Sequence, residues 1–380
     1  MDLKEYLSEL EHLVNIDSGT YDIDGVNKVA DYFISGFREM GWSIKEYTSS
    51  DIKCGKCVVC TNREADHYDL LMIGHTDTVF KKGTCKERPF TVNGNRAFGP
   101  GVCDMKHGCL LMYHLLKELP PETNNSLNIV AIFNPDEEIG SLFSKDIYAE
   151  YAEKSDYAFV YEAANEKTGC CTERKGNVVY QIEFKGKAGH CAYVDRNGAI
   201  SAVHEMGKWI VMFDSMADLE NGTTVNVGIA NGGMRKNIVA PSASLTVDAR
   251  FCDAKTGERI EKAVKEMCSQ AKQRGIETTV SSCRKPAFKR SGDADEYIKH
   301  IEKITKEKGI DFKYALRGGV SDANLISQYD VICIDGLGPE GDLAHCEDEY
   351  MNVNSVMPYY NLSKLLIEDL VEYKKERRNK

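Results

Sequence analysis

The chain has 380 residues, of which 42% are hydrophobic and 28% are charged, and its formal net charge is −11. This length exceeds what one hydrophobic core usually supports, so two domains are expected. An acidic chain without a basic stripe is a poor candidate for binding nucleic acid or an anionic membrane surface, and no partner of either kind is expected.

Helical and strand-like patterns alternate in the first part of the chain. The opening MDLKEYLSELEHLV predicts an amphipathic helix and not a signal peptide, because it lacks a basic start and an apolar core. No apolar run in the sequence approaches the ~20 residues of a membrane span. Helices are predicted over 2–15, 24–40 and 105–118, and strands near 42–47, 55–61, 69–74, 127–133 and 157–161. This alternation predicts a mostly parallel sheet covered by helices.

The pattern changes near Lys175 and Gly176. The next elements follow in the order β-α-β-β-α-β, near 177–190, 198–213, 223–229, 243–251, 254–273 and 276–282. This order predicts a ferredoxin-like α+β unit. A helix over 293–307, a strand over 330–335 and a helix over 354–374 then resume the first pattern. The sequence therefore predicts a discontinuous α/β domain, residues 1–175 and 287–380, with a smaller domain, residues 176–286, inserted in it.

Histidines and acids recur where apolar strands end, as in LLMIGHTD, IVAIFNPDEE and YAFVYE. Two further candidates stand before a predicted helix, in GVCDMKHG, and late in the chain, in LAHCEDEY. These residues are His75, Asp77, Asp104, Glu137, Glu138, Glu162 and His345. Because the carboxyl ends of parallel strands line one crevice, we expect these side chains to converge there.

Two imidazoles and several carboxylates suit Zn²⁺, which accepts nitrogen and oxygen ligands. The acids are numerous enough to hold two ions, with one carboxylate bridging them. Asp77 is better placed to orient His75 than to bind metal, because a ligating imidazole usually donates its other N–H to a carboxylate. In the pair Glu137 and Glu138, one acid could ligate while the other acts as general base, and the residues alone leave the order open.

Each signal also has an ordinary structural interpretation. The pair His75 and Asp77 could be a hydrogen-bonded cap, Glu137 and Glu138 a solvated turn at a helix start, and Asp104 a helix N-cap. Fourteen cysteines without an export signal favour a reducing cytoplasm. The run CGKCVVC (Cys54, Cys57 and Cys60) invites an iron–sulfur interpretation, but strand spacing puts successive members on opposite faces.

Together the motifs resemble those of peptidase family M20, over nearly the whole chain. GHTDTVF resembles H-x-D-T-V, DEEIGS resembles E-E-x-G, and HCEDEY resembles the end of the acetylornithine deacetylase pattern. GPGVCDMKHG resembles G-x-x-D-M-K-G-G, with His107 where glycine is usual. GKAGHCAYVDRNGAI resembles the signature that opens the smaller domain of the family. The resemblance implies a zinc-exopeptidase-like catalytic domain with a mixed, mostly parallel sheet, and an inserted ferredoxin-like dimerisation (lid) domain.

The resemblance also implies roles for the converging side chains. His75 and Glu162 would hold one Zn²⁺, Glu138 and His345 would hold the other, and Asp104 would bridge them. Co²⁺ or Mn²⁺ could substitute for either ion. The bond between Asp104 and Met105 would be cis. Asp77 would orient His75, and Glu137 would be the general base.

Further residues are implied for substrate binding in a cytoplasmic homodimer. His190 would be a catalytic residue that reaches into the active site of the partner subunit and helps hold the oxyanion, and its structural alternative is an ordinary exposed histidine in a turn. Asn237 and Arg250 would grip a substrate carboxylate, Arg250 through its bidentate fork, unless it is a structural salt-bridge partner. Gly318 and Gly319, in the loop RGGVSDAN, would let the backbone approach the substrate.

The expected function is zinc-dependent cleavage of an amide bond in a peptide or N-acyl amino acid with a free carboxylate, as in glutamate carboxypeptidases. The first alternative is an N-acyl amino acid deacylase of the acetylornithine deacetylase or succinyl-diaminopimelate desuccinylase type. The second is a catalytically silent relative that binds metal. The presence of Glu137 argues against the second.

Overall fold

The computed structural model describes residues 1–378, and the chain divides into two compact units. Unit 1 comprises Met1–Glu173, Lys289–Leu316 and Ser321–Lys380, and unit 2 comprises Arg174–Phe288 and Arg317–Val320. The predicted domain boundaries, 175/176 and 286/287, each lie two residues from these divisions. The short segment 317–320, which the prediction leaves in the catalytic domain, belongs to unit 2.

The main sheet of unit 1 has six strands in the order β1-β2-β6-β3-β7-β17. Their bounds are Ser43–Tyr47, Cys57–Thr61, Ile129–Asn134, Tyr68–His75, Ser155–Val160 and Ile332–Ile334. β6, β3, β7 and β17 are parallel, whereas β1 and β2 pair antiparallel at one edge. All six strands coincide with predicted ones. The sheet is mixed and mostly parallel, as expected.

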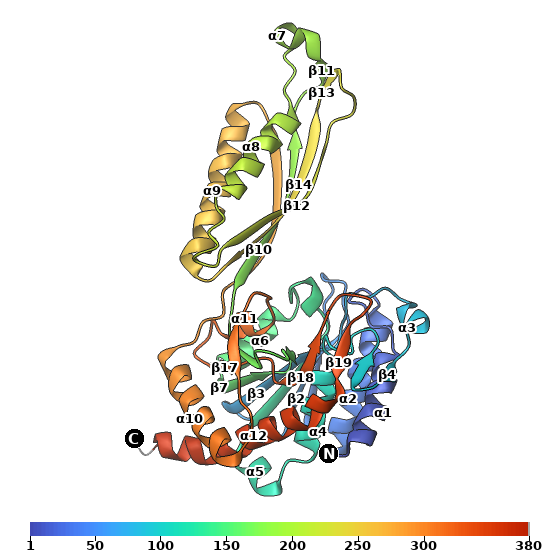
Figure 1. Ribbon diagram of the computed structural model, residues 1–380, viewed down its shortest axis with the longest axis vertical. Coiled ribbons are helices and arrows are strands. Elements are labelled where there is room, and N and C mark those ends of the chain that lie inside the picture. Colours follow the sequence, from blue (N-terminus) through green and yellow to red (C-terminus); the bar gives the residue numbers. More distant parts are fainter. Residues whose placement is uncertain (379–380) are drawn as a thin grey trace. The chain divides into compact units, whose positions relative to one another are not determined.

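Helices cover both faces of this sheet, which explains why β3 has eight buried residues in succession (Figure 1). Leu70 and Met72 face the core shared with helices α1, α2, α4, α10 and α12. These helices span Leu3–Val14, Ile23–Glu39, Lys106–Lys117, Gly292–Lys308 and Val356–Arg378. Leu71 and Ile73 are buried on the other face, and α6 (Lys145–Ala152) contacts β3.

A second sheet in unit 1 has the order β4-β5-β19-β18-β8. Its strands span Thr91–Asn93, Arg96–Phe98, Tyr350–Asn352, Gly338–Asp342 and Ala163–Ala164. The sequence does not predict this sheet, because its strands are short and β18 is rich in glycine. β8 follows β7 directly and pairs in parallel with β18. The sheet thereby brings the chain that leaves β7 beside the late hairpin of β18 and β19.

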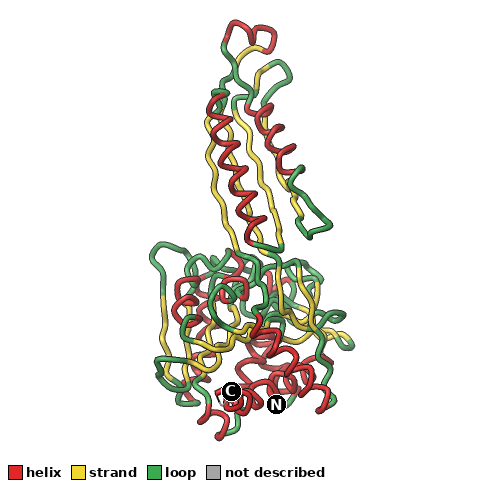
Figure 2. Tube along the Cα trace, turned by 90° about the vertical axis from the view of Figure 1, so that its left-hand side faces the viewer, coloured by secondary structure: helices red, strands yellow, loops and turns green. Residues whose placement is uncertain are grey.

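Unit 2 is built on an antiparallel sheet in the order β12-β14-β10-β15. The strands span Thr224–Gly232, Ser242–Phe251, Gly176–Lys185 and Glu277–Lys285, and the helices α8 and α9 span Ala202–Asp214 and Ala254–Gln273. Both helices lie against one face of the sheet, and β10 and β14 alternate between buried and exposed side chains accordingly (Figure 2). The chain order is the β-α-β-β-α-β order expected from the sequence.

The two ends of the long segment in unit 2 lie side by side. Arg174 and Phe288 exchange two backbone hydrogen bonds, of 2.9 and 3.0 Å. At the far ends of β10 and β14, the strands β11 (Gly189–His190) and β13 (Ile238–Val239) form a small separate sheet. Within unit 2, β10 therefore runs from the Arg174–Phe288 pair at one end to this small sheet at the other.

Short elements complete the described structure. The helical ones are α3 (Thr84–Glu87), α5 (Pro121–Ser126), η1 (Glu137–Ile139), η2 (Cys191–Tyr193), α7 (Val194–Asn197), α11 (Ala323–Ile326) and η3 (Val353–Ser355), and the strands are β9 (Cys170–Arg174) and β16 (Tyr314–Arg317). Across residues 1–378, no helix has the length and apolar character needed to cross a membrane.

Candidate active site

Five potential metal ligands meet at one edge of the main sheet of unit 1. His75 is the last residue of β3, Glu138 lies in η1 after β6, and Glu162 follows β7. β6, β3 and β7 are parallel neighbours, so their carboxyl ends bring these three side chains together. Asp104 comes from the loop before α4, and His345 from the loop between β18 and β19.

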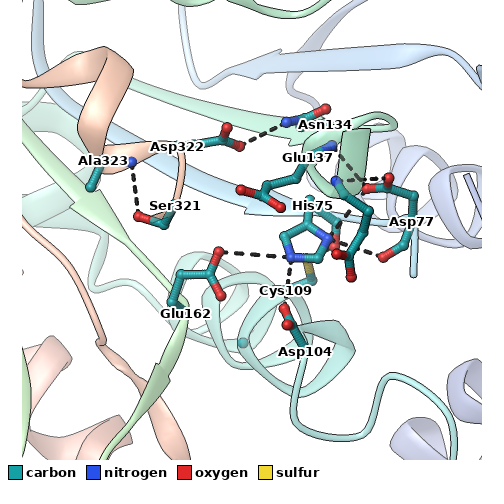
Figure 3. Close-up of polar contacts among 12 residues, drawn as sticks. His75, Asp77, Asp104, Cys109, Asn134, Glu137, Glu162, Ser321, Asp322 and Ala323 are labelled. Atoms are coloured by element: carbon teal, nitrogen blue, oxygen red, sulfur yellow. Dashed lines mark hydrogen bonds and ion pairs between the residues drawn. The ribbon is translucent and has the colours of Figure 1, made fainter. Parts of the chain in front are cut away.

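The carboxylate of Asp104 belongs to two groups of potential ligands at once. Its Oδ1 lies 2.9 Å from Nε2 of His75, and its Oδ2 lies 3.1 Å from Nε2 of His345. Oε1 of Glu162 lies 3.7 Å from Nε2 of His75, and Oε2 of Glu138 lies 3.2 Å from Nε2 of His345. In Figure 3 the carboxylates of Asp104 and Glu162 are both directed at the same nitrogen of the His75 ring. Each oxygen of Asp104 thus faces a different group.

Both groups fit a divalent ion. Ligand atoms held tetrahedrally at zinc–ligand distances of 2.0–2.1 Å lie roughly 3.3 Å apart, and the separations of 2.9–3.7 Å bracket that value. In addition, Oε1 of Glu138 is buried and accepts no hydrogen bond from the described residues. A buried carboxylate oxygen without a donor is unfavourable unless a cation compensates it.

The buried carboxylates at this edge of the main sheet also favour a bound cation. Burial, with the nearby charge of Asp104, raises the pKa of Glu138 and of Glu162 above the usual range. Hydrogen bonds to Asp104 and Glu138 raise the pKa of His345 to about 11. A divalent cation would balance the carboxylates and take the place of the imidazole proton.

Asp77 is fully buried and connects the two groups of ligands. Its carboxylate lies 3.3 Å from Nδ1 of His75. It also accepts the backbone N–H groups of Glu137 and Glu138, each at 3.2 Å, and the hydroxyl of Thr20 at 2.7 Å. Figure 3 shows Asp77 beside both His75 and Glu137. Asp77 therefore holds the turn that carries Glu137 as well as the imidazole of His75.

Asp104 is not the N-cap of the helix that follows it. The N-cap of α4 is Met105, and no side chain accepts a capping hydrogen bond there. The carboxylate of Asp104 faces the two imidazoles instead, so the capping interpretation is wrong. The peptide bond between Asp104 and Met105 is cis, as the family resemblance implies.

Helix α4 packs closely on the end of β7 because residue 108 is glycine. A Cβ atom at Gly108 would lie 1.8 Å from the carbonyl oxygen of Tyr161, the residue before Glu162. Only a residue without a side chain permits this approach. The contact brings the helix that follows Asp104 against the strand that leads to Glu162.

His107, which departs from the family pattern, has a structural role. Its Nε2 lies 2.9 Å from the carbonyl oxygen of Pro339, and its Nδ1 accepts the N–H of Gly108. Burial lowers the pKa of His107 to about 4, so the ring is neutral. The ring connects α4 to β18 and belongs to neither ligand group.

His345 lies in an uncommon backbone conformation. Its φ is +66°, and Leu343 in the same loop has a φ of +58°. This left-handed region costs a residue with a side chain roughly 1–2 kcal/mol. Non-glycine residues adopt it where surrounding contacts enforce it, often at functional sites. The loop between β18 and β19 is therefore held in a shape that presents His345 to Asp104.

Two of the predicted site residues of unit 2 lie together. His190 in β11 pairs with Ile238 in β13, so it lies beside Asn237. The side chains of His190 and Asn237 are exposed. The backbone N–H of Cys191 also donates to the carbonyl oxygen of Asn237, at 3.1 Å.

Arg250 lies at the opposite end of β14 from this pair. Eight residues of strand separate it from Ser242, or about 27 Å at 3.4 Å per residue. Its guanidinium binds Asp248 through Nε at 3.1 Å and donates from Nη1 to the carbonyl oxygen of Gly318 at 2.9 Å. The carbonyl of Gly319 accepts a hydrogen bond from Arg174 at 3.1 Å. Arg250 thus makes the salt bridge that was its alternative role, next to the predicted glycine loop.

The cysteine run does not assemble a cluster. Cys57 and Cys60 are buried in β2, and Cys54 precedes the strand. In the part of the chain that the structure describes, no group of three potential metal ligands includes any of them. The iron–sulfur interpretation therefore has no ligand set.

A cleft of about 530 Å³ opens beside Glu138. Its wall is largely apolar and includes Tyr21, Val79, Phe80 and Ile139. Tyr21 and Val79 are 63% and 42% exposed, which is high for large apolar side chains. The cleft can take up a substrate group next to the ligand groups.

Sequence reasoning missed two residues that support this site, Thr20 and Glu349. Thr20 binds Asp77, and Glu349 accepts backbone N–H groups from the loop that carries Asp104. Thr20 stands in an unremarkable loop, and Glu349 is one acid among three in CEDEY. Glu349 is signalled only by its proximity in sequence to His345, and Thr20 has no such signal.

A profile of peptidase family M20/M25/M40 matches residues 71–369, which include all five candidate ligands. The chain belongs to peptidase family M20/M25/M40. It is a metallohydrolase that acts on amide bonds. The family and enzyme class expected from the sequence are thereby confirmed.

Members of this family with similar sequences include a peptidase and a deacylase. Carboxypeptidase G2 of Pseudomonas sp. (strain RS-16) is 28% identical over 371 residues, which cover 96% of this chain and 89% of that protein. Acetylornithine deacetylase of Myxococcus xanthus is 28% identical over 207 residues, which cover 50% of this chain and 52% of that protein. The crystal structure of a tripeptidase from Staphylococcus aureus subsp. aureus Mu50 matches with a TM-score of 0.77 and 21% identity, over 98% of this chain and 99% of that one. The M20 peptidase fold is thus confirmed.

Proposed function

We propose that this M20 protein is a dizinc hydrolase that cleaves the amide bond of a small peptide or N-acyl amino acid with a free carboxylate. The observation that carries the proposal is the placement of Asp104, whose two oxygens face two separate ligand groups. A carboxylate that faces two groups in this way is suited to bridging two ions.

His75 and Glu162 would hold one Zn²⁺, Glu138 and His345 would hold the other, and Asp104 would bind both. Bound there, the two ions would polarise the carbonyl of the scissile bond and lower the pKa of a water molecule. Co²⁺ or Mn²⁺ would substitute, because nitrogen and oxygen ligands accept them.

Glu137 would act as the general base. It stands next to the ligand Glu138 in η1, and Asp77 fixes the backbone of both residues. From this position the carboxylate of Glu137 would take a proton from the attacking water and pass it to the nitrogen of the leaving amine. Asp77 would keep the turn in place and hold the tautomer of His75.

The substrate carboxylate and the carbonyl oxygen would be bound by unit 2 residues of two subunits. His190 and Asn237 lie towards the Ser242 end of β14, which is about 27 Å of strand from Arg250, so the three cannot touch one small substrate together within one unit. A homodimer removes the difficulty, because one subunit can supply Arg250 and its partner His190 and Asn237.

The surface of unit 2 supports this dimer. β12 is an edge strand of the sheet, so one of its sides is open to pairing. Ile229 in β12 and Val211 in α8 are 54% and 69% exposed. An open strand with apolar side chains nearby is suited to contact between copies of the chain. We further propose a cytoplasmic location, since fourteen cysteines suit a reducing compartment.

A carboxypeptidase is the first candidate, because the match to carboxypeptidase G2 covers most of both chains. An N-acyl amino acid deacylase is the second, because acetylornithine deacetylase matches at the same identity over about half of each chain. Both reactions break the same kind of bond and need the same groups. They differ in the acyl group, which the cleft beside Glu138 could take up.

The test is a panel of dipeptides and N-acyl amino acids assayed with Zn²⁺-loaded protein. Each substrate is paired with its C-terminal amide, which lacks the free carboxylate. We expect hydrolysis of the free acids and a loss of at least tenfold with the amides, since an amide cannot form the charge-assisted hydrogen bonds that a carboxylate forms with an arginine. Chelation should abolish turnover and added Zn²⁺ or Co²⁺ should restore it. Activity that survives full metal removal would contradict the proposal.

A further inference from the structure

Glu349 is a buried carboxylate that stands outside both ligand groups. Its side chain is only 1% exposed. Oε1 accepts the backbone N–H of Cys103 at 2.7 Å and that of Asp104 at 3.0 Å, and Oε2 accepts the N–H of Gly101 at 3.0 Å. All three donors belong to the loop that ends at Asp104. One side chain therefore binds most of the loop that presents this ligand.

Glu349 is also tied to His345. It stands four residues later, immediately before β19, and its N–H donates to the carbonyl oxygen of Cys346 at 3.3 Å. The N–H of Cys346 in turn donates to the carbonyl oxygen of Leu343 at 3.0 Å. These turns fix the path of the chain around His345. The same short segment thus carries His345 and binds the loop that carries Asp104.

Packing beneath this connection leaves little room for either part to move. A Cβ atom at Gly341 in β18 would lie 2.5 Å from Sγ of Cys103. Gly341 pairs with Met351 in β19, so the loop of Cys103 rests directly on the hairpin. The hydrogen bonds of Glu349 join the same loop to the same hairpin segment.

A carboxylate suits these donors better than any other side chain. It offers two oxygens that only accept, whereas an amide of the same shape would turn an N–H₂ group toward at least one backbone N–H. Its negative charge lies close to Asp104, and burial next to another acid is unfavourable in itself. An uncharged contact would avoid this penalty, so the presence of a carboxylate here points to a role in the site and not only in stability.

We propose that Glu349 is a positioning residue that holds Asp104 at the separation from His345 that the second metal ion requires. The inference rests on the proposed dimetal function. Glu349 touches neither the ions nor the substrate, and acts through the backbone of Asp104. Groups that orient metal ligands in this way typically change metal affinity 10–100-fold when removed.

The experiment compares wild type with Glu349→Gln, Glu349→Ala and the control Asp348→Asn. Asp348 is exposed, one residue away, and its substitution removes the same charge without touching the loop. Zn²⁺ binding is measured by titration of chelator-treated protein, and Mn²⁺-loaded protein is examined by electron paramagnetic resonance for coupling between the two ions. We expect the second ion to bind roughly tenfold more weakly in Glu349→Gln and about 100-fold more weakly in Glu349→Ala, with weakened coupling.

Thermal unfolding of the metal-free variants separates positioning from loss of the fold. Glu349→Gln should unfold as a single folded protein and recover two ions at high Zn²⁺, whereas Asp348→Asn should match wild type throughout. Equal affinity and unchanged coupling in Glu349→Gln would overturn the inference, and so would an equal loss in Asp348→Asn. If wild type itself binds fewer than two ions, the dimetal function is wrong, and this result is independent of the role of Glu349.

Discussion

Nδ1 of His75 lies 3.0 Å from the backbone carbonyl oxygen of Asp77 and 3.3 Å from its carboxylate. The sequence predicts that the carboxylate alone orients the imidazole. The carbonyl is the nearer acceptor, which leaves the carboxylate of Asp77 to bind Thr20 and the backbone of Glu137 and Glu138. The position of the imidazole and that of the adjacent acids therefore depend on the same residue.

Replacing Glu137 with glutamine should abolish hydrolysis without emptying the metal site. Glutamine keeps the size of the side chain but cannot accept a proton, so turnover should fall by about 10²–10⁴-fold. Metal content should stay near that of wild type, because Glu137 belongs to neither ligand group. Turnover and bound Zn²⁺ are measured on the same preparation. Glu347→Gln, at an exposed position near His345, serves as control, and wild-type turnover in Glu137→Gln would reject the base assignment.

Two inactive variants with substitutions in unit 2 should regain activity when they are mixed. His190→Ala and Arg250→Ala should each lower kcat/KM by about 100-fold or more, because each removes a charged or polar contact to the reacting substrate. In a mixed dimer, one site receives Arg250 from the first subunit and His190 from the second. After subunit exchange, a mixture of the two variants should regain up to about a quarter of wild-type activity, as expected for random pairing in a two-fold dimer. No recovery despite proven exchange would place both residues in one subunit's site.

Gly108→Ala should destabilise unit 1 and weaken metal binding. The added methyl group would meet the carbonyl oxygen of Tyr161, so α4 must move away from the end of β7. We expect a loss of about 3 kcal/mol in the free energy of unfolding, at the upper end for overpacking. Gly292→Ala is the control, because a Cβ atom there has no neighbour within 4 Å. Calorimetry and Zn²⁺ titration of both variants test this, and equal effects at the two positions would contradict the packing argument.

The stability of unit 2 should depend on Arg274 at neutral pH and progressively less as the pH falls below about 4. Glu205 is 2% exposed, and Nε of Arg274 donates to it at 2.7 Å. Burial opposes ionisation of Glu205, but hydrogen bonds and the charge of Arg274 lower its pKa below the usual value. A lowered acid pKa stabilises the fold above the unfolded pKa, about 4.3, and this stabilisation is lost as pH falls through the folded pKa.

Arg274→Ala should therefore lower the free energy of unfolding by about 2 kcal/mol at pH 7, and by much less near pH 3. Denaturant unfolding at the two pH values measures the difference. Lys272→Ala, exposed at the same end of α9, should change stability by less than about 0.5 kcal/mol. A pH-independent cost of Arg274→Ala would show that lost packing, and not the ion pair, explains it.

The parts of the site that could be predicted are those fixed by local patterns. The unbroken apolar run of β3 predicts a strand buried on both faces, and in a parallel sheet its end lies beside those of β6 and β7. That argument places His75, Glu162 and the pair Glu137 and Glu138 at one edge, and the family resemblance is needed to choose Glu138 as the ligand. Asp104 was harder, because an acid before a helix has the same pattern as an N-cap. The tertiary contact with two imidazoles overrides that local preference.

The parts of the site that could not be predicted depend on contacts between segments far apart in the chain. β18 reads GPEGD, which has no strand pattern, and its pairing with β8 and β19 forms only in the folded protein. Without that hairpin, neither the left-handed backbone at His345 nor the hydrogen bonds of Glu349 can be anticipated. The separation of Arg250 from His190 likewise required the register of β10 and β14.

The paired backbones of Arg174 and Phe288 have a consequence for how the chain finds its fold. Glu162 and His345 must meet across the whole of the inserted segment, and closing a loop costs entropy that grows with the logarithm of its length. Once the insertion has folded, its two ends are adjacent, and the effective loop is much shorter. This lowers the closure cost by roughly 1 kcal/mol. The folded insertion thus holds the two parts of unit 1 close together in the chain, and folding is favoured along routes in which the insertion forms early.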